Sequence, residues 1–450
     1  MGHYRKVVMG AALALGTCAA LYAQGGGQNA PAAPVDDPIK TMVDQLTLDQ
    51  YKTTLKGLTQ FGDRRQGTQR NRDAVDWIQK QLESYGYTNA ARIEYDPPVP
   101  TRECGPSVPA SVVVAPPPRA GGAGAAGAGA AGAGRGNANA GRGLATGPGG
   151  SRSVGNVAAT GVNCDPMAQP DERIRALDSG PFINKPVHDV YVTKIGTKYP
   201  NEMYIVGAHM DGHGYNEAVN DDGSGTALVM ELARVFANPN VQTERSIRFA
   251  LWNGEEGGLN GARAYVAQRE KLQGIEEPKG SGKYPEPKWI AMIQHDMMMW
   301  DHGMPQPVMG ADGKQQMDGR GRPMFMAPKD QRPEADVNVE FQSRAKMADE
   351  AMKLAFLFKY AGEKYATDYP VNVGPHMTNT DSDPFMDIVP AISLRENERG
   401  AQTGSGWNPT WHTPLDVWST FTDKDFRLAL NAAQTTLSAI AQLAGASVKK

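Results

Sequence analysis

The sequence predicts an α/β fold, a doubly wound and mostly parallel central sheet with helices on both faces. From Val187 onward, short runs rich in β-branched and aromatic residues alternate with segments of helical spacing. That alternation is typical of parallel strands joined by crossover helices. Histidine and acidic residues follow several of these runs directly, at the carboxyl edge where open α/β sheets place their ligands.

The individual elements follow from the spacing of apolar residues. Apolar residues between Thr41 and Gly86 recur every three or four positions, which predicts helices, and Arg92–Tyr95 predicts an edge strand ended by prolines. Further strands are expected over residues 187–197, 203–212, 247–252, 289–294 and 391–394. Further helices are expected over residues 224–237, 261–268, 345–360 and 425–443.

The first 23 residues are predicted to be a signal peptide. Arg5 and Lys6 precede an apolar stretch from Val7 to Ala14, and small residues follow. This stretch is too short to span a membrane, so we expect an exported protein, periplasmic or secreted, without a membrane span. A lipid anchor at Cys18 is a weaker alternative, because threonine precedes it where a smaller residue is usual.

A loop-rich insertion is expected to interrupt the folded domain. After a linker at 24–40, the domain comprises residues 41–96 and 187–445, and the insertion covers 97–186 with a disordered Gly/Ala tract at 120–150. Cys104 and Cys164 lie on either side of that tract and are the two cysteines left after export, which predicts a disulfide. In the chain-entropy model such a cross-link stabilises by about 4 kcal/mol.

The overall charge of the chain bears on its partners. The net charge of −3 gives no reason to expect binding to nucleic acid or to an anionic membrane.

Two adjacent glutamates, Glu255 and Glu256, stand in the turn between strand 247–252 and the helix that follows. Adjacent carboxylates repel each other, and the fold gains nothing from them. A site that uses one as a metal ligand and the other as a base would explain the pair. On this stretch alone, a solvated acidic turn is the alternative.

Five residues near strand or helix ends form a candidate ligand set without cysteine. They are His209, Asp221, Glu256, Asp296 and His412. This donor chemistry suits zinc or a similar divalent ion. Five ligands allow two ions with two private ligands each and one shared carboxylate. Asp211 and Glu255 adjoin the ligands, and they are candidates for orienting them and for proton transfer.

Five motifs carry a resemblance to a known family, the co-catalytic zinc exopeptidases of the aminopeptidase S and aminopeptidase Y type. The motifs, in family order, are GAHMD at 207–211, NDDGSG at 220–225, NGEEGGLNGA at 253–262, IQHDM at 293–297 and WHTPLD at 411–416. The resemblance implies two zinc ions bridged by Asp221. It assigns Glu256 and His412 to one ion, and His209 and Asp296 to the other.

The same resemblance implies that Glu255 is the general base and that Asp211 orients His209 through its ring N–H. It predicts an exported di-zinc metallopeptidase that hydrolyses peptide bonds with metal-activated water and releases N-terminal residues from peptide substrates. Carboxypeptidase or dipeptidase activity and a non-catalytic binding ectodomain are the alternatives. One departure concerns specificity: Pro384 stands where the family often has histidine, and His376 upstream cannot be assumed to replace it.

The remaining polar residues near these motifs have simpler interpretations. His295 should point away from Asp296 and pack, because neighbours in a strand face opposite sides. His213 could contact substrate or lie outside the ligand shell, Asp222 should start a helix, and Met297–Met299 should line the core or a pocket. Arg395 and Glu396 could contact substrate or form a surface ion pair.

Overall fold

The computed structural model describes most of the chain from residue 37 onward. The described residues are 37–97, 162–183, 186–301, 306–307, 309–314, 316–317, 325–326, 335–375, 380–396, 408 and 410–449. The predicted signal peptide, the Gly/Ala tract, Cys104 and His376 lie outside them. The Cys104–Cys164 disulfide therefore stays a prediction.

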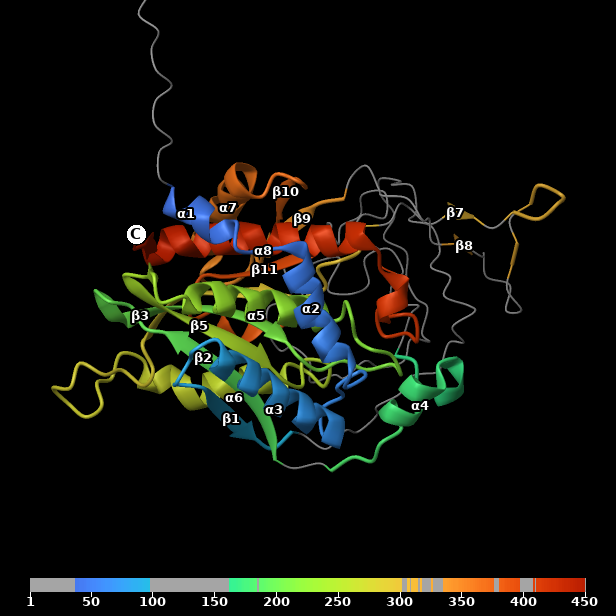
Figure 1. The fold of residues 1–450 in the computed structure, drawn as a ribbon, viewed down its shortest axis with the longest axis horizontal. Coiled ribbons are helices and arrows are strands. Elements are labelled where there is room, and N and C mark those ends of the chain that lie inside the picture. The colour runs from blue at the N-terminus through green and yellow to red at the C-terminus, as the bar shows by residue number, and fades with distance from the viewer. Residues whose placement is uncertain are drawn as a thin grey trace, which may run out of the picture. The chain divides into compact units, whose positions relative to one another are not determined.

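Within the described residues, the main sheet has the strand order β1-β2-β5-β3-β6-β11-β9-β10 (Figure 1). The four inner strands β5, β3, β6 and β11 pair in parallel, whereas β1, β2 and β9 each join an antiparallel neighbour. Their bounds are β1 (Ala91–Tyr95), β2 (Val187–Lys194), β3 (Tyr199–His209), β5 (Arg245–Trp252), β6 (Lys288–His295), β9 (Val337–Phe341), β10 (Val371–Gly374) and β11 (Ala391–Glu396). The predicted fold class is confirmed, and β9 and β10 are strands that the sequence did not predict.

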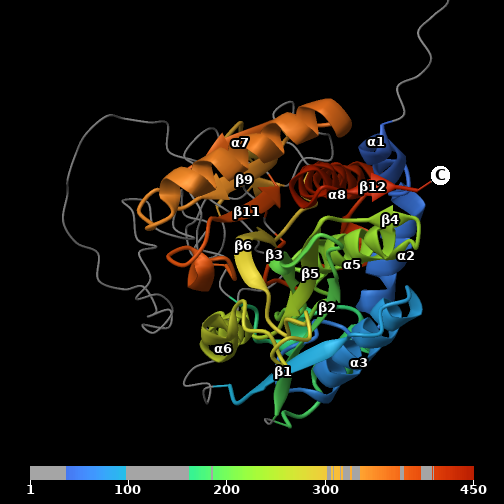
Figure 2. The ribbon, with the colours of Figure 1, turned by 90° about the vertical axis from the view of Figure 1, so that its left-hand side faces the viewer.

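Helices cover both faces of this sheet, with α6 on one side and α5 and α8 on the other (Figure 2). Strand β3 shows the division, because Tyr204 and Val206 join the larger apolar core while Met203 and Ile205 join the smaller one beneath α6. The helices are α1 (Pro38–Val43), α2 (Leu48–Thr59), α3 (Gln69–Ser84), α4 (Glu172–Asp178), α5 (Gly223–Ala237), α6 (Asn260–Arg269), α7 (Ala348–Tyr365) and α8 (Asp423–Ala444). Among the described residues, no helix is long and apolar enough to cross a membrane.

Three of the parallel strands end at the same level. In the registers of the pairs, His209 of β3 lies beside Trp252 of β5, and Ala208 lies beside His295 of β6. Helix α5 begins near this edge, where the side chain of Asp222 caps its first turn by accepting a hydrogen bond from the N–H of Gly225. Residues that follow these strands therefore converge, as the sequence predicted.

The described part of the expected insertion is more ordered than a set of loops. Residues 162–183 include a short 3₁₀ turn (Pro166–Ala168) and helix α4, which begins at the cap residue Asp171. The described residues also form two separate two-stranded sheets. One pairs β4 (Val241–Gln242) with β12 (Ser447–Val448), and the other pairs β7 (Gln306–Pro307) with β8 (Phe325–Met326).

Candidate metal centre

The first group of ligand atoms surrounds His209, the last residue of β3. Its ring Nδ1 lies 2.9 Å from the main-chain carbonyl of Asp211. A carbonyl can only accept, so Nδ1 carries a proton and Nε2 is the ring nitrogen left to bind a metal. Nε2 faces Asp221 Oδ1 at 3.3 Å and Asp296 Oδ1 at 3.8 Å. We call these three residues the His209 trio.

The carboxylate of Asp221 reaches both sides of the centre. While Oδ1 faces His209, Oδ2 lies 3.1 Å from His412 Nε2. The main chain here is held by Asp416, whose two oxygens accept hydrogen bonds from the N–H groups of Asn220 and Asp221 at 2.8 and 3.0 Å. Asp221 is thus placed to bridge two cations.

The neighbouring Asp222 serves the fold, as predicted. Its carboxylate accepts hydrogen bonds from the main-chain N–H groups of Gly225, Met297 and His209. These contacts join the start of α5 to the ends of β3 and β6 and use the oxygens that could otherwise bind a metal.

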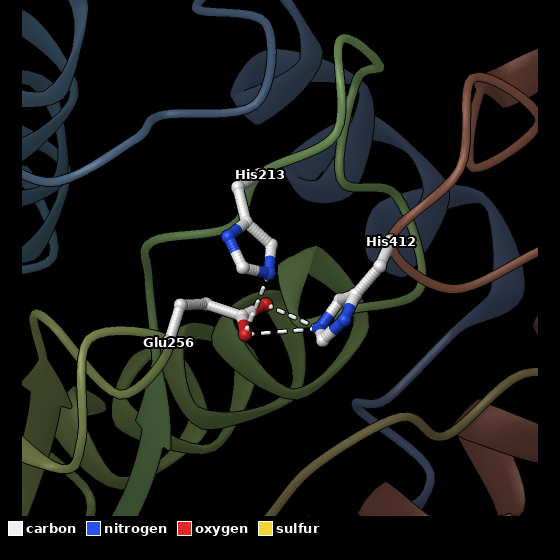
Figure 3. Close-up of side chains that lie close together, drawn as sticks. All are labelled: His213, Glu256 and His412. Carbon is white, nitrogen blue, oxygen red and sulfur yellow. Dashed lines mark hydrogen bonds and ion pairs between the residues drawn. The ribbon is translucent and has the colours of Figure 1, made fainter. Parts of the chain in front are cut away.

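A second group of ligand atoms surrounds Glu256 (Figure 3). His412 Nε2 lies 3.0 Å from Glu256 Oε1 and 2.9 Å from Oε2, and His213 Nε2 lies 3.0 Å from Oε2. The two imidazole rings are nearly perpendicular, with their centroids 4.3 Å apart. We call His213, Glu256 and His412 the Glu256 trio.

His213 is the residue of this group that the sequence interpretation did not include among the ligands. It lies four residues after His209, in a loop flanked by glycines that leaves the carboxyl end of β3. That position on a strand-end loop was the available signal, because such loops carry functional residues on a rigid scaffold.

The arrangement of donor atoms fits metal ions. Within each trio, one ligand atom per residue can be chosen so that all lie within 4.8 Å of one another. His209 Nε2, His213 Nε2 and Glu256 Oε2 are buried and make no hydrogen bond. Buried polar atoms are normally satisfied, and one cation within each trio would satisfy all three atoms. Imidazole and carboxylate donors without thiolate suit zinc.

The electrostatics of the Glu256 trio favour positive charge between its members. Burial alone would lower the pKa of His412, but the nearby charges of Glu256 and Asp221 outweigh it and raise the pKa to about 9. Burial alone would raise the pKa of Glu256, but His213 and His412 outweigh it and lower the pKa to about 2. Metal binding at such a group displaces protons and takes advantage of the same attraction.

Glu255 belongs to neither trio and is fixed through its main chain. Its N–H donates to Asp211 Oδ1 at 3.1 Å, and its side chain is buried. Burial would lower the pKa of His209, but Asp222, then Asp221 and Asp296, and lastly the charge of Glu255 raise it well above the usual range. The carboxylate of Glu255 therefore lies within electrostatic range of His209. The two adjacent glutamates therefore differ in position, because Glu256 is a member of a trio and Glu255 lies beside it.

Asp211 accepts the ring N–H of His209 with its main-chain carbonyl and not with its carboxylate. Its carboxylate lies 3.8 Å from His209 Nδ1, while the ring N–H bonds to the main-chain carbonyl of the same residue. The main chain of Asp211 therefore orients His209, and the carboxylate orients the main chain of Glu255. Burial raises the pKa of Asp211 to about 6.

A further buried acid, Asp381, lies near this group and was not predicted. Burial raises its pKa well above the usual range, and the charges of Glu255 and Asp211 add to the increase. Gln294 of β6 donates to its Oδ2 at 3.4 Å. Pro384, which replaces the expected histidine, lies in the short 3₁₀ turn Asp383–Phe385 that follows.

The predicted packing role of His295 is confirmed. It is fully buried, with ring contacts of 3.0 Å to the carbonyl of Gly207 and 2.8 Å to the hydroxyl of Thr436. Met297–Met299 are buried as expected.

Arg395 and Glu396 do not form a surface ion pair, because both side chains are buried. Arg395 Nη2 lies 2.7 Å from Asp296 Oδ2, the oxygen that does not face His209. Glu396 accepts hydrogen bonds from the side-chain amides of Asn220 and Asn408. Arg395 therefore holds the side chain of Asp296, and Glu396 holds that of Asn220, the neighbour of Asp221.

Arg64 holds the loop that carries Asp211 and His213. This arginine is fully buried, and its guanidinium donates to the carbonyl oxygens of Met210, Glu217 and Ala218, each at 2.8 Å. It thereby fixes both ends of the loop. Since Arg64 lies between α2 and α3, the N-terminal helices contribute directly to the shape of the site.

Comparison with solved structures agrees with this architecture. A zinc aminopeptidase from Bacillus subtilis superposes with a TM-score of 0.51 at 15% identity, covering 90% of this chain and 96% of that one. An aminopeptidase from Aneurinibacillus sp. gives 0.50 at 18% identity, covering 90% and 95%. At these identities the likeness establishes the fold.

Comparison of sequences identifies the family as well as the fold. The chain is 34% identical to a probable lipoprotein aminopeptidase of Mycobacterium tuberculosis over 162 residues, which is 35% of this chain and 27% of the relative. It is 30% identical to carboxypeptidase Q of Xenopus laevis over 98 residues, 21% of each chain. The chain thus aligns with less than a third of the length of these relatives. Residues 190–436 match the model of peptidase family M28. Because that match spans more than half of the chain, the protein belongs to peptidase family M28, and so to the co-catalytic zinc exopeptidases that its motifs resemble.

Proposed function

We propose that this protein holds two zinc ions and hydrolyses peptides from their amino terminus. The observation that carries the proposal is the position of Asp221, whose two oxygens face His209 at 3.3 Å and His412 at 3.1 Å. A carboxylate shared in this way, with one trio on each side, suits a pair of ions.

The two ions would supply Lewis-acid chemistry, lowering the pKa of a water molecule and polarising the peptide carbonyl. The side chains of the two trios would hold and orient them. Glu255 accepts a proton from the attacking water and donates it to the departing amine, which is the work of a general base and then of a general acid. Asp211 supports this step because it fixes the main chain of Glu255.

The amino-terminal preference is supported by relatives named as aminopeptidases, among them one from Mycobacterium tuberculosis and YwaD from Bacillus subtilis. Carboxypeptidase activity is the second candidate, because relatives also include carboxypeptidase Q. Initial rates on one peptide series with free, N-acetylated and C-amidated ends separate the two. Aminopeptidase activity survives amidation and is lost on acetylation; the reverse pattern would establish a carboxypeptidase.

We also propose that the protein is exported and carries a Cys104–Cys164 disulfide, as the N-terminal segment and the cysteine pair predict. N-terminal sequencing of the protein recovered outside the cytoplasm should begin after Ala20 or Ala23. Thiol titration of the unfolded, unreduced mature protein should find no free thiol. Recovery of the intact N-terminus, or of two thiols, would contradict the respective statement.

A further inference from the structure

We propose that His213 is a sixth protein ligand, so that the ion held by Glu256 and His412 has one more protein donor than the ion held by His209 and Asp296. This inference rests on the proposed binding of two zinc ions. It concerns a residue outside the five ligands that the motifs supply.

The position of the imidazole is the first argument. His213 Nε2 lies 3.0 Å from Glu256 Oε2, on the same carboxylate that His412 contacts (Figure 3). Despite that short distance, neither His213 Nε2 nor Glu256 Oε2 makes a hydrogen bond. Two buried polar atoms in contact, but not aligned for hydrogen bonding, are arranged to share a third partner.

The ring nitrogens of His213 argue against a packing role. Its side chain is buried, 10% exposed against 5% for Glu256 and for His412. A packing histidine would satisfy its ring nitrogens within the protein, as His295 does with Gly207 and Thr436. His213 leaves Nε2 without a hydrogen bond and directs it into a group of ligands.

The backbone around His213 is built to keep the two imidazoles together. Asn216 Nδ2 donates to the carbonyls of His213 and Thr413, at 3.0 and 2.8 Å. It therefore joins the two loops directly beside the two histidines.

Two more residues with amide side chains join the loop of His213 to the loop of His412. Asn163 donates its main-chain N–H to the carbonyl of His412 and its side-chain amide to the carbonyl of Gly214. Gln169 Nε2 donates to the carbonyls of Tyr215 and Pro414 at 2.8 and 3.0 Å. We call Asn163, Gln169 and Asn216 the amide clamp.

Close packing of the two loops requires glycine at position 214. Gly214 has φ +117, and a Cβ there would lie 2.7 Å from the carbonyl oxygen of His412. A side chain would separate the loops and withdraw His213 from the trio.

An additional ligand makes the two halves of the centre unequal. Counting Asp221 on both sides, the Glu256 side offers four protein donors, the number that zinc takes in closed sites. The His209 side offers three and keeps a position for a small molecule, as catalytic zinc sites do. The Glu256 side should therefore bind zinc more tightly, and the His209 side should exchange zinc and accept substrate.

Zinc binding to the full chain, stripped with a chelator and titrated against a competing chromophoric chelator, tests this assignment. Wild-type protein should bind two ions with separable affinities. In His213→Ala and His213→Gln, the tighter affinity should fall by more than the roughly 10–100-fold expected for loss of an outer partner, and the weaker one should persist. Circular dichroism with excess zinc checks the fold, and the glutamine variant keeps a polar side chain at the site.

The control is His188→Ala, which removes an imidazole of β2 that belongs to neither trio and lies 3.4 Å from Glu94 of β1. It should leave both affinities unchanged. If wild type binds two ions and both His213 variants bind them equally well, His213 is not a ligand, although the proposed function stands. If wild type itself binds no zinc, the proposed function and this inference fail together.

Discussion

The two trios of the metal centre stand on different kinds of backbone. In the His209 trio, His209 ends β3, Asp296 directly follows β6 and Asp221 directly precedes the cap of α5. In the Glu256 trio, all three residues stand on loops. The sheet ladder therefore positions the first trio, whereas the second depends on side chains that tie loops together.

The supporting contacts differ in the same way. The His209 trio is supported by groups on regular elements, such as Arg395 of β11 against Asp296 and Asp222 at the start of α5. The Glu256 trio is supported by the amide clamp, which joins carbonyls of two loops. A ligand at the end of a strand needs few supporting side chains, because the neighbouring strands already fix its backbone. A ligand on a loop needs several.

The largest effect should come from Glu255, which belongs to neither trio. Glu255→Gln should keep both zinc ions, because no ligand is lost, while kcat falls by about 10²–10⁴, the usual contribution of general acid–base catalysis. Rate and metal content are measured on the same preparation, with the exposed Glu94→Gln as control. Loss of zinc from Glu255→Gln would mean that it is a ligand, and an unchanged rate would contradict the peptidase mechanism.

The next comparison removes one private ligand from each trio. Glu256→Gln and Asp296→Asn should each weaken one of the two zinc affinities, by more than the roughly 10–100-fold typical of an outer partner. Activity of both variants should recover in part with excess zinc, by mass action. Elemental analysis after dialysis should find about one ion in each. If either substitution removed both ions together, the trios would not be separate sites.

A smaller loss of zinc affinity, confined to the His209 side, is expected when Arg395 is replaced. Its guanidinium holds the oxygen of Asp296 that faces away from His209, at 2.7 Å. Arg395→Met should lower zinc affinity on the His209 side by roughly 10–100-fold, as for other groups that orient a ligand. The Glu256 side should not change, and Arg92→Met, on the exposed edge strand, serves as a control. Equal weakening of both affinities would indicate a general loss of structure.

The smallest effect should arise in the amide clamp, where each member is one of three. Asn216→Ala should weaken only the affinity of the Glu256 side, by roughly the lower end of the 10–100-fold range. Adding Gln169→Ala should increase the loss by more than the single effects predict, since both act on the same two loops. Strict additivity, or weakening confined to the His209 side, would count against the clamp.

The same contrast between strand ends and loops decides how much of the fold and of the site could be predicted from the sequence. The inner strands were predictable because each is a short apolar run, and His209 and Asp296 follow such runs. Strands β9 and β10 were not, because they have five and four residues and carry polar side chains such as Asn338 and Glu340 that are buried only in the folded sheet.

The role of His213 depends on loop shape that periodicity does not encode. Tyr215, Ala218 and His412 all adopt positive φ, a conformation that non-glycine residues rarely take and that surrounding contacts must enforce. Tertiary contacts, among them those of Arg64 and the amide clamp, hold this loop against the segment that carries His412.

Arg64 has one more consequence, which concerns the N-terminal helices. Residues 37–97 hold the His213 loop through three carbonyls, yet they are separated in sequence from the rest of the centre. Thermodynamic reciprocity then applies: if docking of these helices raises zinc affinity, bound zinc must strengthen their docking by the same factor. The N-terminal helices and the metal would then each strengthen the binding of the other to the rest of the protein.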